Sequence, residues 1–179
     1  MSDARFEDGM DKPLRLIAFD AEDLQVLSAM TQDAVWPAAQ MVWHSKERRF
    51  AVLLNRFRWE ARGTSRTERV QSVLSFEDVK AVQTQGFDRT DPDLILSLLS
   101  ITFTPATDGT GACLLTLAGD GAIRLEVEAL EAGLRDVTRP YASPTNRAPS
   151  HDQPTQIGLR LGRHRAKSGQ SWGIECHKL

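Results

Sequence analysis

The sequence is poor in the side chains that most often carry out covalent chemistry. It has two cysteines, Cys113 and Cys176, and four histidines, of which only His44 precedes the C-terminal tail. Two cysteines make no disulfide framework, which is typical of a reducing compartment. Cys113 lies in an apolar run and is expected to be a small core residue, whereas His44 lies at a polar turn. We therefore assign no catalytic residue.

Long apolar runs are also missing. The longest, 94–101, is interrupted by serines, whereas a membrane-spanning helix needs about 20 apolar residues. The first twelve residues contain several carboxylates and no apolar segment, so they resemble neither a secretory signal nor an Arg-rich transit peptide. These absences predict a cytoplasmic protein that has no membrane partner.

Ligand-binding motifs are equally scarce. The glycine pairs at 109–111 and 119–121 are expected to form hairpin turns, because neither lies between a strand and a helix N-terminus, where phosphate loops occur. The metal-binding side chains of the tail are His151, His164, Cys176 and His177. Their spacing fits no compact zinc pattern, so we predict no metal and no cofactor.

The charges of the chain are unevenly distributed. Seven of the 22 basic residues but only two of the 24 acidic residues follow residue 138, so the body is acidic and the tail is basic. A chain of 179 residues is long enough for one domain with a sizeable core. We expect a disordered N-terminus at 1–12, a single globular domain at 13–138 and a basic, disordered tail at 139–179.

The strongest strand signal lies between Arg48 and Glu60. Residues 50–54 are apolar on both faces, as in a buried strand. The stretch then alternates, with Phe57 and Trp59 on one face and Arg56, Arg58 and Glu60 on the other. This pattern predicts a strand that begins in the core and ends by presenting guanidinium groups to solvent.

The remaining periodicity predicts an α+β fold. Asp20 is expected to cap a helix over 21–34 that follows a strand at 14–19. Further strands are expected at 39–44, 69–76, 79–85, 94–103, 113–117 and 123–127. A second helix is expected over 128–137, where Leu130, Leu134 and Val137 share a helical face.

About seven consecutive strands followed by a helix predict a mainly antiparallel, curved sheet or partly open barrel. This order of elements is that of a pleckstrin-homology-like (PH-like) barrel with its C-terminal helix. The extra N-terminal strand and helix would close an open edge or cover one face. A plain α+β sandwich is the alternative, and neither fold fixes a function.

Four segments carry a resemblance to a known family: LRLIAFDAEDL at 14–24, QDA at 32–34, RF to NRFRWE within 49–60, and LSFEDV at 74–79. They resemble the uncharacterised bacterial domain-of-unknown-function family 2948, of alphaproteobacterial type. The resemblance covers about Leu14 to Val137 and leaves out the tail. It implies a gene neighbourhood shared with histidinol dehydrogenase, and it implies no activity.

The candidate binding surface comprises Asp20, Asp23, Asp33, Arg48, Asn55, Arg56, Arg58 and Glu60. If the first helix lies beside the central strand, its carboxylates could meet the arginines around a polar groove for an anionic peptide or a small acid. The more common outcome is that Asp20 caps the helix, Arg56 pairs with Glu60 and the other groups are solvated. A buried Arg56 with bidentate partners would favour the groove.

The tail carries the one indication of nucleic-acid binding, a basic cluster with a stacking residue: Arg160, Arg163, Arg165, Lys167 and Trp172. The acidic body opposes such binding, so nucleic acid is not the expected partner. The function that fits best is a non-catalytic interaction or regulatory module, which binds a protein segment through an Arg-bearing sheet surface. The alternative is a small-molecule-binding protein or cryptic enzyme linked to amino-acid metabolism, and the oligomeric state stays open.

Overall fold

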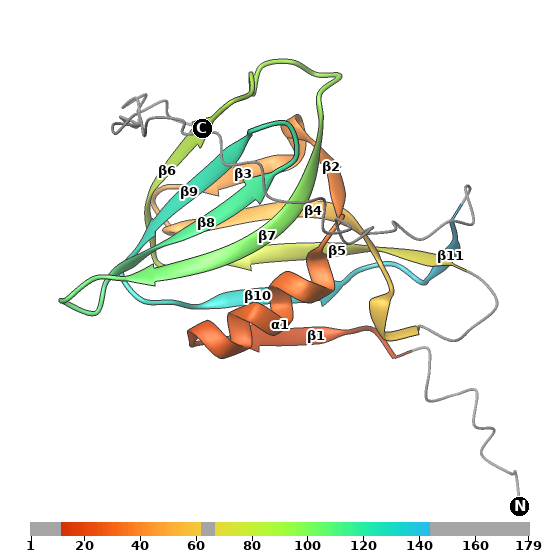
Figure 1. Ribbon diagram of the computed structural model, residues 1–179, viewed down its shortest axis with the longest axis horizontal. Coiled ribbons are helices and arrows are strands. Elements are labelled where there is room, and N and C mark those ends of the chain that lie inside the picture. Colours follow the sequence, from red (N-terminus) through yellow and green to blue (C-terminus); the bar gives the residue numbers. More distant parts are fainter. Residues whose placement is uncertain (1–11, 62–66, 144–179) are drawn as a thin grey trace, which may run out of the picture.

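A computed structural model describes residues 12–61 and 67–143. These residues form one α-helix and eleven strands that belong to one antiparallel sheet (Figure 1). The elements in chain order are β1 (Arg15–Ala18), α1 (Ala21–Thr31), β2 (Val35–Pro37), β3 (Met41–His44), β4 (Arg49–Phe57), β5 (Glu68–Phe76), β6 (Val79–Gln85), β7 (Ile95–Pro105), β8 (Gly111–Leu117), β9 (Ala122–Val127), β10 (Ala132–Asp136) and β11 (Tyr141–Ala142). Short 3-10 turns occur at Ala38–Gln40 and Trp59–Ala61.

The sheet bends over on itself without closing. The strand order is β1-β10-β5-β4-β2-β7-β8-β9-β6, with β11 beside β5 and β3 beside β4. We call β1, β10, β5 and β4 the first half-sheet, and β7, β8, β9 and β6 the second half-sheet. The short strand β2 joins them, because it pairs with both β4 and β7. The α+β class and the curved, antiparallel sheet predicted from the sequence are confirmed.

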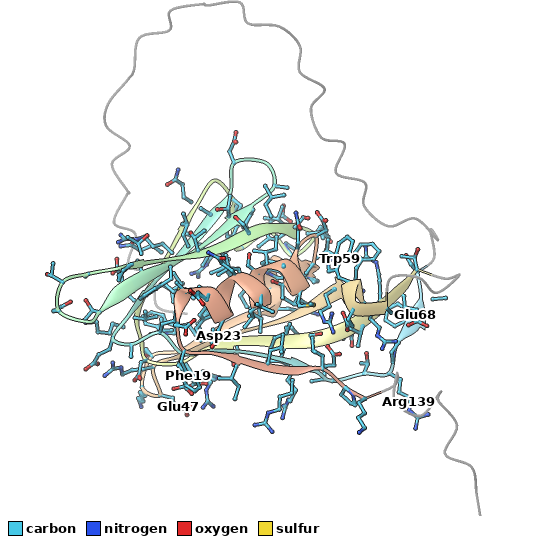
Figure 2. The ribbon with its side chains drawn as sticks, turned by 60° about the horizontal axis from the view of Figure 1, so that its bottom comes forward. Phe19, Asp23, Glu47, Trp59, Glu68 and Arg139 are labelled. Carbon is cyan, nitrogen blue, oxygen red and sulfur yellow. The ribbon has the colours of Figure 1, made fainter. Side chains whose placement is uncertain are left out.

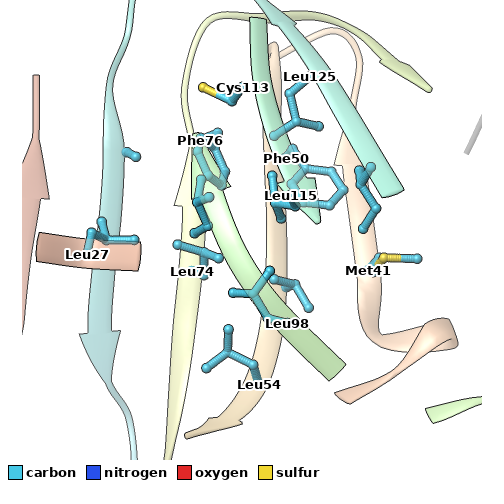
Figure 3. Close-up of a cluster of buried hydrophobic side chains, with 14 of the residues drawn as sticks. Leu27, Met41, Phe50, Leu54, Leu74, Phe76, Leu98, Cys113, Leu115 and Leu125 are labelled. Atoms are coloured by element: carbon cyan, nitrogen blue, oxygen red, sulfur yellow. The ribbon is translucent and has the colours of Figure 1, made fainter. Parts of the chain in front are cut away.

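The hydrophobic core lies between the two half-sheets. Buried side chains alternate along the strands, as shown by Phe50 and Leu54 of β4, Leu74 of β5, Leu115 of β8 and Leu125 of β9 (Figure 3). Burying a side chain of this size contributes about 1.5–3 kcal/mol relative to leaving it exposed. The alternation leaves the opposite face of the first half-sheet free to carry polar residues.

The helix α1 fills the open side of the bent sheet. It begins as predicted, because the Asp20 carboxylate accepts the N–H of Asp23 at 2.8 Å, and it ends at Thr31, three residues before the predicted end. It lies between β7 and β1 (Figure 2). At a bulge in β7, Ser28 Oγ accepts the N–H of Ile101 at 2.8 Å. The helix therefore supplies a hydrogen-bond acceptor for a backbone N–H of β7 at a position with which β2 does not pair.

The prediction of a C-terminal helix over 128–137 is wrong. This segment contains β10, which pairs with β1 on one side and β5 on the other. Its inward side chains, Ala132, Leu134 and Asp136, follow a period of two. The described residues therefore lack the C-terminal helix on which the PH-like comparison depended, and their strands number eleven rather than about seven.

The described chain stays attached to the sheet as far as Ser143. The strand β11 pairs with β5, and the N–H of Ser143 donates to the carbonyl of Thr67 at 2.8 Å. The predictions for 1–11 and for 144–179 lie outside the described residues. Within 12–61 and 67–143, no helix combines the length and the apolar character needed to cross a membrane.

Candidate functional site

The structure distributes the predicted binding surface over separate places. Asp20 and Asp23 are exposed at the N-terminal end of α1, and within the described part of the chain neither forms an ion pair with an arginine. Arg48 lies in the turn before β4, where it pairs with Glu128 and approaches Asp78 at 3.6 Å. Helix carboxylates and strand arginines therefore do not meet among these three residues, and Asp20 caps the helix, which is the more common outcome considered from the sequence.

Arg56 is buried instead of being presented to solvent, and its side chain has 0% exposure. Its Nε donates to Asp136 Oδ1 and Ser72 Oγ, both at 3.1 Å. Its Nη2 donates to Asp136 Oδ2 at 2.9 Å and Glu60 Oε1 at 2.8 Å. Its Nη1 donates to Glu60 Oε2 at 3.0 Å and to the Phe57 carbonyl at 3.1 Å. Every guanidinium N–H therefore has an acceptor inside the chain.

Because all its N–H groups have acceptors within the chain, Arg56 is a structural residue and not a ligand-binding one. The predicted pairing with Glu60 is confirmed, and the bidentate, buried geometry is present. However, a guanidinium offers five N–H donors, and all five are occupied by this chain's own oxygens. Arg56 therefore has no donor left for a ligand, and its role is to hold the fold together.

The network joins three strands, β4, β5 and β10, and also holds the residue that precedes β1. Asp136 of β10 accepts the N–H of Leu14, which precedes β1, at 3.0 Å and the hydroxyl of Ser72 in β5 at 2.6 Å. Burial disfavours the charge on Arg56, but the hydrogen bonds that it donates to Glu60 and Asp136, together with their negative charges, outweigh burial and raise the pKa of Arg56. Burial likewise opposes ionisation of Glu60, yet the Arg56 hydrogen bond and charge hold its pKa below the usual value.

The other predicted residues at this end of β4 have partners within the chain as well. Arg58 pairs with Glu68 at 2.6 Å, and its side chain is only 10% exposed. Asn55 Nδ2 donates to the Tyr141 hydroxyl. Asp33 lies in the loop after α1 with a φ of 60°. Most of the polar residues predicted from the sequence to form a binding surface therefore serve to join strands.

A different arginine-bearing surface lies on the outer face of the first half-sheet. It contains a groove of about 420 Å³ lined by residues from β1, β10, β5 and β4, which we call the outer groove. Its floor consists of Gly133, Ser75 and Ala51, which stand in one row across adjacent strands. Ile17 and Val42 continue this row at its two ends. Small residues in the centre of the row explain why the face is hollowed there.

Two arginines stand side by side at one rim of the outer groove. Arg15 of β1 and Arg135 of β10 are directly opposite in the antiparallel register. The N–H of Asp136 donates to the Leu14 carbonyl at 3.0 Å, so the next pair, 15 and 135, is a non-hydrogen-bonded pair, in which side chains are closest. Among the described residues, neither arginine has an ion pair or a side-chain hydrogen bond.

The opposite rim carries charges of both signs. Arg49 pairs with Glu77 at 2.8 Å, and Glu131 lies beside them in the groove lining. These groups neutralise one another in part, whereas no described carboxylate forms an ion pair with Arg15 or Arg135. The positive potential of the outer groove is therefore concentrated at the end formed by β1 and β10.

Exposed apolar side chains gather on the same face. Of the eight large hydrophobic residues with substantial exposure, five belong to the strands of the first half-sheet or to residues beside them: Ile17, Phe19, Val42, Val137 and Tyr141. Phe19 lies below the ribbon at one end of this layer and Arg139 lies at the other end (Figure 2). Exposed apolar side chains on the same face as two arginines that have no described partner are typical of a docking surface.

The described residues offer little for covalent or metal chemistry. Cys113 is fully buried in β8, and burial raises the pKa of its thiol to about 12. Residues 12–61 and 67–143 contain no grouping of three His, Cys, Asp or Glu side chains suited to a metal ion. The tail residues considered above for metal and for nucleic acid, from His151 onward, lie outside the described residues.

Comparison with known protein families gives a match over most of the chain. The family model described as "Protein of unknown function (DUF2948)" matches residues 14–151, which extends past Val137, where the resemblance was expected to end. The matched range contains the whole outer groove. No curated protein and no solved structure matches the chain.

Proposed function

Because the chain belongs to the DUF2948 family, whose function is unknown, we propose a function from the geometry of the chain itself. The protein is a non-catalytic, cytoplasmic interaction module that binds a protein segment in the outer groove. The observation that supports this proposal is the pair formed by Arg15 and Arg135. The two guanidinium groups lie directly opposite each other at the rim of a hollow, and neither has a partner among the described residues.

Stability alone gives no reason for this arrangement. Like charges directly opposite each other on adjacent strands destabilise a sheet. An arginine on an edge strand can discourage edge-to-edge aggregation, which would account for Arg15. It does not account for Arg135, because β10 is flanked by strands on both sides. A carboxylate placed between the two arginines would neutralise both and could accept hydrogen bonds from each.

The proposal keeps the type of surface expected from the sequence but changes the residues. The arginines expected to bind a partner, Arg56 and Arg58, are committed to Asp136, Glu60 and Glu68. The arginines proposed to bind the partner are therefore Arg15 on β1 and Arg135 on β10.

A site-specific cross-linking experiment tests the proposal. A photo-reactive amino acid replaces Ile17, which is 48% exposed beside the outer groove, or Lys80 on β6 as the control position. We expect a partner protein to be cross-linked from Ile17 and not from Lys80. Adding Arg15→Glu and Arg135→Glu should abolish that cross-link, whereas Lys80→Glu with Arg89→Glu, which changes the net charge equally, should preserve it.

Cross-links that persist after both groove arginines are reversed would contradict the proposal. Thermal unfolding of each variant is measured alongside, because only a folded variant gives an informative loss. A partner cross-linked equally from Ile17 and Lys80 would also contradict it, since the contact would then not be specific to the outer groove.

A second candidate function uses the same site. The outer groove, at about 420 Å³, is within the range of about 300–1,000 Å³ that small-molecule pockets occupy. A small carboxylic acid could be held by Arg15 and Arg135, as in a small-molecule-binding protein linked to amino-acid metabolism. Native mass spectrometry of the protein from its source would favour this candidate if a defined small mass were lost in R15E/R135E.

A further inference from the structure

The first half-sheet ends in β1, whose outer edge has backbone groups without a hydrogen-bond partner in the described part of the chain. The N–H of Asp136 donates to the Leu14 carbonyl, and in an antiparallel ladder every second residue is hydrogen-bonded to the neighbouring strand. The backbone groups of the even-numbered residues of β1 therefore bond to β10. The N–H and C=O groups of Arg15 and Ile17 therefore point away from the sheet. No described residue bonds to them, and β1 forms the lower boundary of the sheet (Figure 1).

The other end of the sheet is less receptive to an added strand. β6 has a register shift between Val79 and Ala81 where it pairs with β9. In addition, the N–H of Val79 already donates to the Arg48 carbonyl at 2.7 Å. Bulges and tethered ends are among the features that keep edge strands from pairing with other chains. β1 has no such irregularity in its register with β10.

The outer edge of β1 adjoins the charged end of the outer groove. Side chains of a strand added along β1 would line up with Arg15 and Ile17 at about 4.5–5.5 Å between Cβ atoms. A carboxylate opposite Arg15 would lie within reach of Arg135 as well, because the two arginines are neighbours across β1 and β10. An apolar residue two positions along would meet Ile17, which is 48% exposed.

We infer that the partner is an acidic, extended segment of another protein that adds to β1 as a further strand of the sheet. Its outward side chains include a carboxylate opposite Arg15 and an apolar residue opposite Ile17, two positions apart. The inference rests on the proposed function, and it specifies the binding mode: main-chain hydrogen bonds give affinity, and the alternate side chains give specificity.

Synthetic peptides test the binding mode on the full chain. The probe is a peptide in which every second residue is threonine. The residues between the threonines are alternately aspartate and valine, and their side chains would lie on the same face as Arg15 and Ile17. Binding is followed by fluorescence polarisation. Two further peptides carry N-methyl groups either on the threonines or on the aspartates and valines. In a β-strand, alternate amides point to opposite edges, so only one set of amides can bond to β1. We expect one methylated peptide to lose at least about tenfold in affinity and the other to bind as well as the probe.

Amide hydrogen exchange provides a second readout. On adding the unmethylated peptide, exchange of the Arg15 and Ile17 N–H groups should slow, whereas that of Leu16, which already faces β10, should not change. A probe that does not bind at all, or two methylated peptides that bind equally, would overturn the strand-addition inference.

The outcomes also separate this inference from the proposed function. If both methylated peptides bind like the probe but R15E/R135E abolishes binding, the outer groove is a binding site and strand addition is wrong. If the probe binds R15E/R135E and wild type equally, the proposed function fails together with the inference. If the proposed function and the strand-addition inference are both right, replacing the aspartates of the probe with lysines should abolish binding.

Discussion

Asp136 is the single residue on which the buried guanidinium of Arg56 depends most. Its side chain is 5% exposed and supplies both oxygens to Arg56. Removing one partner of a buried ion pair costs about 3–5 kcal/mol, because the remaining charge is left without compensation. Asp136→Ala is therefore expected to lower the free energy of unfolding by that amount, measured by urea denaturation.

Glu60→Ala is the matched control for this prediction. Glu60 also pairs with Arg56, but its side chain is 28% exposed, so water can replace the lost carboxylate more easily. We expect a clearly smaller loss. Equal losses in the two variants, or a loss under about 1 kcal/mol for Asp136→Ala, would contradict the central position of Asp136.

The pKa of Glu60 predicts how stability depends on pH. Burial opposes its ionisation, but the Arg56 hydrogen bond and charge lower its pKa from the ordinary value of 4.5. Since the pKa is lower in the folded than in the unfolded state, the stabilisation is fully present above about pH 5 and is lost as the pH falls through the folded value. Thermal unfolding between neutral pH and pH 3 should show a steeper decline in wild type than in Glu60→Gln. Parallel declines would contradict this assignment.

Cys113 gives a test of core packing. Because the thiol is fully buried and burial raises its pKa to about 12, it should not react with a thiol reagent at mildly alkaline pH in the folded protein. In denaturant it should react at the ordinary rate. Mass mapping of the peptide that contains Cys113 distinguishes it from Cys176, and rapid labelling of Cys113 in the native state would contradict the packing of β8.

Single residues also show where the sequence was misleading. Arg56 belongs to a run of charged residues, and the alternation predicted that it faces solvent. Its true environment depends on Asp136, which is 80 residues further along the chain, and no local pattern indicates that pairing. The candidate site was missed for the same reason, because Arg15 and Arg135 become neighbours only when β1 pairs with β10.

At the scale of elements, the contact between α1 and β7 depends on one hydroxyl group. Ser28 Oγ accepts the N–H of Ile101, a residue that is 2% exposed. Leaving a buried backbone donor without an acceptor costs about 1–3 kcal/mol. Ser28→Ala is expected to lower the free energy of unfolding by this amount, whereas Gln25→Ala, an exposed position on α1, should change it by less than about 0.5 kcal/mol. No difference between the two variants would contradict the role of Ser28.

The element that the sequence predicted wrongly is β10. Leu130 and Leu134 are four residues apart, a spacing that fits one face of a helix and also one face of a strand. The residues between and after them on the buried face, Ala132 and Asp136, are small or charged, so the period of two is hidden. Pairing with β1 and β5 decides the outcome, and strand pairing of this kind is not local.

At the scale of the whole molecule, the alternation of apolar and polar residues was enough to predict the α+β class and the antiparallel sheet. The helix cap at Asp20 was predicted from its local chemistry and is confirmed at 2.8 Å. The order of the strands in space could not be predicted, because β1 and β10 lie at opposite ends of the described chain. The position of the outer groove follows from that order.

The central claim is that Arg15 and Arg135 are kept together for binding rather than for stability. Arg135→Glu tests both parts, because it replaces a repulsive cross-strand pair with an attractive one. We expect the free energy of unfolding to rise by about 0.2–1 kcal/mol, while the acidic, strand-forming probe peptide loses most of its affinity. A variant that is less stable than wild type and still binds the peptide would contradict the claim.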